Sequence, residues 1–165
     1  MASSNPTALV VIDVQNCFVN KYTKKIPEKI ARYIKRQKFD HVLFTTFVLN
    51  KRSNLYKLLH WKAFYSSPDT SIHKTVSPFA NHQNTFPRST YSVFKSRKFL
   101  SFLKRNKIKE VALCGIDSDG CVLASAFDAF DLGYNVHALR LLIASSGGRK
   151  FDQAAKVVMS RNLAR

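Results

Sequence analysis

Short apolar runs rich in β-branched residues alternate with amphipathic stretches along most of this chain. The first run, residues 8–14, is too short for a buried helix and is not interrupted by alternating polar residues, which is typical of a strand covered on both faces. Similar runs predict strands at residues 41–48, 110–115 and 135–143. The intervening stretches predict helices at residues 27–37, 96–106 and 121–132, with a last helix from about residue 150. This order predicts an α/β fold of three layers, Rossmann-like, in which helices cover both faces of a mostly parallel sheet.

The stretch from residue 49 to residue 87 interrupts this alternation. It is rich in Asn, Ser, Pro and aromatic residues, has no clear period, and predicts only one short helix near residues 55–59. Long loops at strand ends often form the walls of binding sites. We therefore expect an irregular insertion at about residues 49–87 within a single domain that spans residues 1–165, a length sufficient for one sizeable core.

The chain is strongly basic. Its 27 Lys and Arg residues against 10 Asp and Glu give a formal net charge of +17, while a hydrophobic fraction of 45% argues against disorder. No apolar run approaches the ~18 residues of a membrane-spanning helix, and the N-terminus lacks a signal-peptide pattern. The three cysteines form no CxxC pair, so neither a disulfide framework nor a zinc module is expected. These features predict a cytoplasmic protein with reduced thiols.

Cys121 stands at the start of a predicted helix, directly after a strand and a short turn. Helix N-terminal amides favour an anion, so we expect the pKa of Cys121 to lie below the ordinary value of about 8.5. The same amides could hold a developing oxyanion. Cys121 is therefore a candidate nucleophile, although a free cysteine is more often a small buried apolar residue, and that alternative stays open.

A nucleophilic thiol needs a base to receive its proton. Asp13 is the only charged residue of the first apolar run and stands near its C-terminal end, where open α/β sheets bind their ligands. The residues predict Asp13 as this base, with capping of the following turn as the alternative.

Two segments and one short signature carry a family resemblance. Residues 9–16 read LVVIDVQN, residues 115–122 read GIDSDGCV, and a Tyr-Ser-x-Phe signature runs from Tyr91 to Phe94. They resemble, in order and separation, the motifs of the isochorismatase-like cysteine hydrolases, the superfamily that includes nicotinamidases and related amidohydrolases. One position departs from the pattern, because Arg88 stands where the family carries Lys.

The resemblance implies a catalytic triad of Asp13 as proton acceptor, Arg88 in place of the Lys, and Cys121 as nucleophile. It also implies a cis peptide bond between Ile116 and Asp117, and an oxyanion hole made by the amides of Asp117 and Cys121. Such a site would hydrolyse a carbon–nitrogen bond of a small molecule through a thioester on Cys121, without a cofactor.

Four further residues are expected to contact the substrate: Gln15, Phe18, Trp61 and Tyr91. Core packing is the alternative for Phe18 and Trp61. Nicotinamidase-type enzymes hold a metal with an Asp-x-His cluster after the second strand, whereas residues 45–50 here read TTFVLN and the five histidines are scattered. We therefore expect no metal, and we do not expect nicotinamide as the substrate.

Arg88 leaves a second interpretation open. A guanidinium keeps its charge and pairs well with a carboxylate, but it does not donate a proton at ordinary pH. The alternative is a catalytically impaired member of the same fold that serves in binding or assembly and associates with polyanions.

The surplus of positive charge suggests an acidic substrate or partner. For the hydrolase we expect a small-molecule substrate, with anionic compounds as one class, and the resemblance implies a homo-oligomer. No membrane association is expected. Specific nucleic-acid binding is not expected because no nucleic-acid-binding signature is present, while non-specific association with polyanions stays open.

Overall fold

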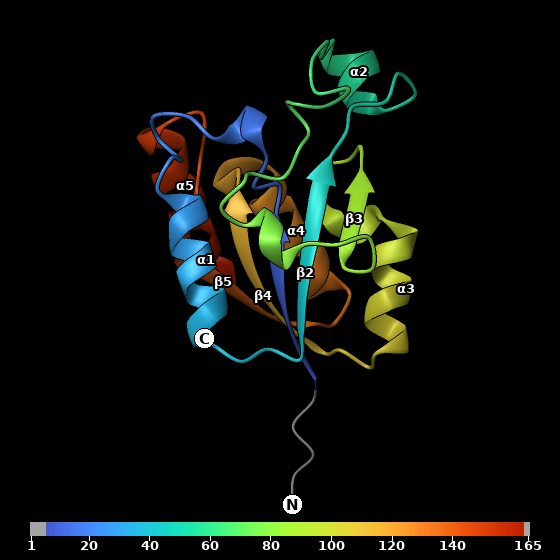
Figure 1. Cartoon of the computed structure of the whole chain (residues 1–165), viewed down its shortest axis with the longest axis vertical. Coiled ribbons are helices and arrows are strands. Elements are labelled where there is room, and N and C mark those ends of the chain that lie inside the picture. The colour runs from blue at the N-terminus through green and yellow to red at the C-terminus, as the bar shows by residue number, and fades with distance from the viewer. Residues whose placement is uncertain (1–5, 164–165) are drawn as a thin grey trace, which may run out of the picture.

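The computed structural model describes residues 6–163, which fold around a central sheet of five parallel strands (Figure 1). The strands are β1 (Thr7–Ile12), β2 (His41–Phe47), β3 (Thr85–Arg88), β4 (Glu110–Ile116) and β5 (Asn135–Ala144). Their order in the sheet is β3-β2-β1-β4-β5, and every neighbouring pair is parallel. The predicted three-layer α/β fold is therefore confirmed.

Five α-helices surround the sheet. They are α1 (Ile26–Arg36), α2 (Asn54–Leu59), α3 (Arg97–Arg105), α4 (Leu123–Asp131) and α5 (Arg149–Leu163). Val10 of β1 belongs to a core with α3, α4 and α5, whereas its neighbour Val11 belongs to a core with α1 and α2. Successive residues of a strand point to opposite faces, so an unbroken apolar run is what this doubly covered strand requires. Within residues 6–163, no helix is long and apolar enough to span a membrane.

The structure adds an element that the sequence pattern did not predict. β3 has only four residues and contains Pro87, so its pattern is too short to be recognised. It occupies the edge of the sheet, the position where a strand tolerates proline. β3 forms the last part of the stretch predicted as irregular, and it places Arg88 beside Phe47 at the end of β2.

The carboxyl ends of the strands meet at one edge of the sheet, where ligands bind in open α/β folds. Figure 1 shows the segment that carries α2 beyond the tips of β2 and β3. At this edge β4 approaches β1 so closely that a Cβ atom at Gly115 would collide with the backbone of Ile12. Gly115 also has a φ of 122°, a conformation that glycine adopts readily. Gly115 thus lets the turn that follows β4 lie next to the end of β1.

Candidate active site

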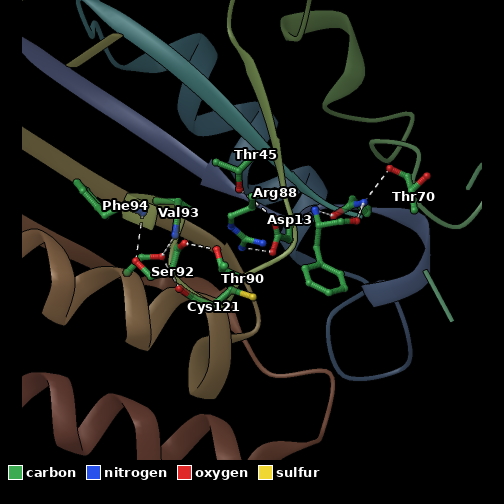
Figure 2. A network of polar contacts seen from close by, with 12 residues as sticks. Asp13, Thr45, Thr70, Arg88, Thr90, Ser92, Val93, Phe94 and Cys121 are labelled. Carbon is green, nitrogen blue, oxygen red and sulfur yellow. Dashed lines mark hydrogen bonds and ion pairs between the residues drawn. The ribbon is translucent and has the colours of Figure 1, made fainter. Parts of the chain in front are cut away.

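Asp13 follows β1 directly and is fully buried. Its Oδ2 atom accepts a hydrogen bond of 2.6 Å from Nη2 of Arg88, and its Oδ1 atom accepts one of 2.9 Å from the Thr45 hydroxyl (Figure 2). The backbone of Asp13 has a φ of 50°, a left-handed conformation that Asp tolerates better than most residues. Both oxygens of this carboxylate are thus held in a fixed orientation.

Arg88 ends β3 and is 8% exposed. Its guanidinium lies 5.9 Å from the centroid of the Phe47 ring, a cation–π arrangement. Burial lowers the pKa of Arg88, but Asp13 and Cys121 more than offset this effect, so the pKa is raised and the side chain stays charged. Among the described residues its buried Nε and Nη1 atoms have no hydrogen-bond partner. Only part of the donor capacity of Arg88 is therefore used by Asp13.

Cys121 lies in a π-helical turn, Ser118–Val122, which leads directly into α4. The carbonyl of Asp117 accepts hydrogen bonds from the amides of Gly120 at 3.2 Å and of Val122 at 3.0 Å, so it holds the turn on both sides of Cys121. Such π-helical turns occur frequently at functional sites. Figure 2 shows the Cys121 sulfur facing the Asp13–Arg88 pair.

The thiol of Cys121 lies close enough to Asp13 and Arg88 for both charged groups to shift its pKa. Burial and the Asp13 carboxylate raise the pKa of Cys121, whereas the Arg88 guanidinium lowers it, and the net direction is upward. The expectation of a lowered pKa is therefore wrong, because desolvation and the Asp13 carboxylate outweigh the Arg88 guanidinium. The raised pKa favours the protonated thiol of Cys121, which lies beside the buried Asp13 carboxylate.

The peptide bond between Ile116 and Asp117 is cis, the conformation that the resemblance implies. The Asp117 carboxylate is turned towards Ser146, which donates to it from its hydroxyl at 3.0 Å and also from its backbone amide. Burial raises the pKa of Asp117, and these hydrogen bonds oppose that shift. The side chain of Asp117 therefore braces the loop before α5.

Gln15 was expected to contact the substrate, but the structure gives it a bracing role. Its side chain is fully buried, and its amide nitrogen donates to the carbonyls of Phe47 at 3.0 Å and of Thr70 at 2.8 Å. Its amide oxygen accepts from the backbone amide of Phe47 at 2.7 Å. Since these contacts use both ends of its amide, Gln15 joins β1 to the end of β2 and to the long loop.

The other three residues expected at the substrate belong to one aromatic group. The Phe18 ring stacks on that of Phe64 at 5.3 Å, and both lie near Phe47. Trp61 packs edge-on against Phe47 at 5.8 Å and against Tyr91 at 6.2 Å. Phe18 is buried, whereas Tyr91 is 40% exposed. The group therefore runs from the core to the surface, with Trp61 and Tyr91 at its outer end.

A cavity of about 470 Å³ adjoins the turn that carries Cys121. Its walls are Trp61, Tyr91, Asp117, Asp119, Gly120, Leu123, Ala124 and Phe127. Aromatic and aliphatic side chains form most of this wall, Asp119 adds an acidic residue, and none of the described residues that line it is basic. Trp61 and Tyr91 therefore line a cavity that reaches the residue preceding the candidate nucleophile.

Two site residues escaped the sequence analysis. Thr45 fixes the Asp13 carboxylate, and Ser125 donates to the carbonyl of Cys121 at 2.6 Å while accepting from the amide of Val93 at 3.1 Å. In the sequence, the only signal of either residue is that a polar side chain stands in an otherwise apolar stretch. Across residues 6–163 no group of three or more His, Cys, Asp or Glu side chains could hold a metal ion.

Comparison with known proteins identifies the family of this chain. Residues 7–164 match the family model of the isochorismatase domain, and the chain therefore belongs to the isochorismatase family. Isochorismatase family protein 2A of Dictyostelium discoideum is 28% identical over 159 residues, which cover 93% of this chain and 74% of that protein.

Solved structures show the same fold. An isochorismatase-like hydrolase from Alkaliphilus metalliredigens superposes with a TM-score of 0.82 at 19% identity, covering 94% of this chain and 91% of that chain. The nicotinamidase of Bacillus subtilis superposes with a TM-score of 0.80 at 20% identity, covering 95% of this chain and 96% of that chain. At these identities the likeness extends to the fold alone, and hydrolases are among the proteins that share it.

Proposed function

We propose that this protein hydrolyses a carbon–nitrogen bond of a small amide, with Cys121 as the nucleophile. One observation carries the proposal: the Cys121 sulfur faces the Asp13 carboxylate, which Arg88 holds at 2.6 Å and which raises the pKa of Cys121, at the ends of neighbouring strands (Figure 2). A nucleophile, a base and a group that orients the base are the parts that covalent catalysis requires.

The raised pKa of Cys121 assigns the proton in the resting site to sulfur. When a substrate carbonyl approaches, the thiol proton passes to the Asp13 carboxylate as sulfur attacks the carbonyl carbon. The carbonyl oxygen gains the negative charge of the tetrahedral intermediate. The backbone amides of Asp117 and Cys121 are the groups we assign to hold this oxyanion.

Protonation of the leaving nitrogen falls to Asp13, because a guanidinium does not release a proton at ordinary pH. The protonated Asp13 returns the proton, the carbon–nitrogen bond breaks, ammonia or an amine leaves, and a thioester remains on Cys121. A water molecule then gives its proton to Asp13 and attacks the thioester carbon. The carbon–sulfur bond breaks, and the thiolate recovers the proton from Asp13. Arg88 serves throughout as a fixed positive charge that orients Asp13.

The cavity next to the turn suggests the class of substrate. Its aromatic and aliphatic wall suits an apolar or aromatic amide. Asp119 and the lack of a basic residue among the described wall residues disfavour an anionic substrate. We therefore propose a neutral small amide, in contrast to the acidic substrate that the net charge alone suggests.

The test is ammonia release from a panel of small aromatic and aliphatic primary amides. Cys121→Ala should abolish turnover, whereas Cys114→Ala, which changes a buried thiol of β4, should retain it. Intact-protein mass spectrometry with slow substrates should show an acyl adduct on Cys121. Turnover that survives in Cys121→Ala would eliminate the proposed mechanism.

A further inference from the structure

A groove of about 650 Å³ lies at the β5 edge of the sheet, away from the cavity beside Cys121. Residues that precede or belong to α1 form one wall, β5 forms the floor, and α5 forms the other wall. Figure 1 shows α1 and α5 at this side of the molecule. The first wall contributes four basic side chains: Lys21, Lys24, Lys25 and Lys29. Arg140 of β5 and two residues of α5, Arg149 and Lys156, complete the basic lining.

The groove holds almost no negative charge to balance these cations. Its single acidic wall residue is Asp152, which accepts hydrogen bonds from Lys156 at 2.8 Å and from the Ser118 hydroxyl at 2.8 Å. Within residues 6–163, Lys156 is the only one of the basic wall residues that forms an ion pair. Like charges crowded into one concave surface repel each other and attract an anion of matching extent.

Aromatic rings accompany the charge. Tyr22 lies in the groove wall, is 46% exposed, and has the Lys21 ammonium 5.0 Å from its ring centroid. Phe151 is a second exposed ring, at 53%. Gly147 and Gly148, the two residues before α5, lie next to both rings. A Cβ atom at Gly148 would contact the Tyr22 ring at 3.5 Å, and one at Gly147 would contact the Phe151 ring at 3.2 Å. Exposed rings next to a basic groove are the combination that binds single-stranded nucleic acid without sequence preference.

We propose that this groove binds a single-stranded polynucleotide, with phosphates along the basic walls and bases against Tyr22 and Phe151. An acidic peptide would use the charge but would gain little from the rings. A membrane surface is flat and would not enter a groove. The proposal concerns binding that does not depend on base sequence, and it does not rest on the hydrolase activity.

The experiment is fluorescence anisotropy of the full-length protein with a labelled single strand of about 12 nucleotides, within the ~4–16 nucleotides that such sites occupy. Lys24→Glu/Arg140→Glu reverses two exposed groove charges, and Lys98→Glu/Lys109→Glu reverses two exposed charges elsewhere. At about 0.1 M salt we expect the groove variant to bind at least about tenfold more weakly, and the control to change by less than about threefold. The salt dependence of binding should also be shallower for the groove variant than for the wild type. Equal effects in the two variants would overturn the proposal.

The rings supply a second test, which also replaces the first if the reversed groove variant does not fold. Tyr22→Ala should weaken binding of DNA and RNA single strands several-fold and leave binding of heparin and polyglutamate unchanged. An equal loss for all four polyanions, or no loss for any, would contradict a polynucleotide as the ligand. Comparing the DNA and RNA strands identifies which of the two the groove prefers. Tighter binding of polyglutamate than of either strand would instead assign the groove to an acidic protein.

Discussion

The Asp13–Arg88 pair and the basic groove use positive charge in opposite ways. Arg88 is buried and paired with a carboxylate at 2.6 Å, while most of the groove's cations are exposed and have no ion-pair partner among the described residues. A buried charge must be compensated within the protein, whereas an exposed one is compensated by solvent and salt. The first arrangement fixes a proton acceptor, and the second leaves its charge available for a ligand.

Arg88→Met should produce the largest effect. It leaves the Asp13 carboxylate buried without its partner, and we expect the free energy of unfolding to fall by about 3–5 kcal/mol. Urea denaturation measures this loss. The double variant Asp13→Leu/Arg88→Met, which removes both charges, should recover part of the stability, and a loss as large as in the single variant would contradict the role of the pair.

Thr45→Val tests the second support of the same carboxylate. The valine keeps the shape of the side chain but removes the donor to Oδ1 of Asp13, which should cost about 1.5–3 kcal/mol. Thr46→Val in the same strand is the matched control, because no side-chain hydrogen bond joins Thr46 to Asp13. A similar loss in both variants would show that the cost arises from packing instead.

Alkaline pH should destabilise the protein through its three thiols. Burial raises the pKa of Cys17 to about 12 and raises the pKa values of Cys114 and Cys121, all from an ordinary 9.0. Well below pH 9.0 these thiols are protonated in both the folded and the unfolded chain and contribute no pH dependence. Above it the unfolded chain loses protons first, so stability declines until the folded-state pKa values are reached, by at most about 1.4 kcal/mol per thiol and pH unit.

Cys114→Ala isolates one of these contributions. Cys114 is fully buried, and the wild type and the variant differ only at this thiol, so the difference between their slopes of stability against pH reports Cys114. Urea midpoints measured from pH 8 to pH 10.5 should decline less steeply in the variant. Identical slopes would mean that Cys114 titrates as it does in the unfolded chain.

Arg140→Met should give the smallest effect on stability. Arg140 is exposed and has no ion-pair partner within residues 6–163, so we expect the free energy of unfolding to change by less than about 0.5 kcal/mol. Thermal denaturation at low and high salt provides the measurement. A loss comparable to that of Arg88→Met would remove the contrast between the two regions.

The sequence predicts the parts of the fold that depend on local pattern. The apolar run of β1 and the amphipathic period of α1 predict elements within a few residues of those observed. β3 was missed because four residues that include a proline do not form a strand pattern, and its pairing with β2 arises only in the folded chain. Residues remote in sequence, such as Asp13 and Arg88, were brought together only through the family resemblance.

The electrostatics of the site were less predictable. The position of Cys121 after a strand predicts a helix N-terminus, but how deeply the thiol is buried and how close Asp13 lies depend on the packing of β1 against β4. Those two factors reverse the expected direction of the shift in the Cys121 pKa. In the same way, the sequence shows the basic residues of the groove as scattered clusters, and only the fold brings residues 21–29 next to residues 140–156.

The most direct test of the proton transfer is the pH profile of Cys121 alkylation by iodoacetamide, read by peptide mass spectrometry. Its midpoint should lie above that of a free thiol. Because Asp13 raises and Arg88 lowers the pKa of Cys121, Asp13→Asn should move the midpoint down and Arg88→Met should move it up. A wild-type midpoint below that of a free thiol, or shifts of the same sign in both variants, would contradict Asp13 as the acceptor of the Cys121 proton.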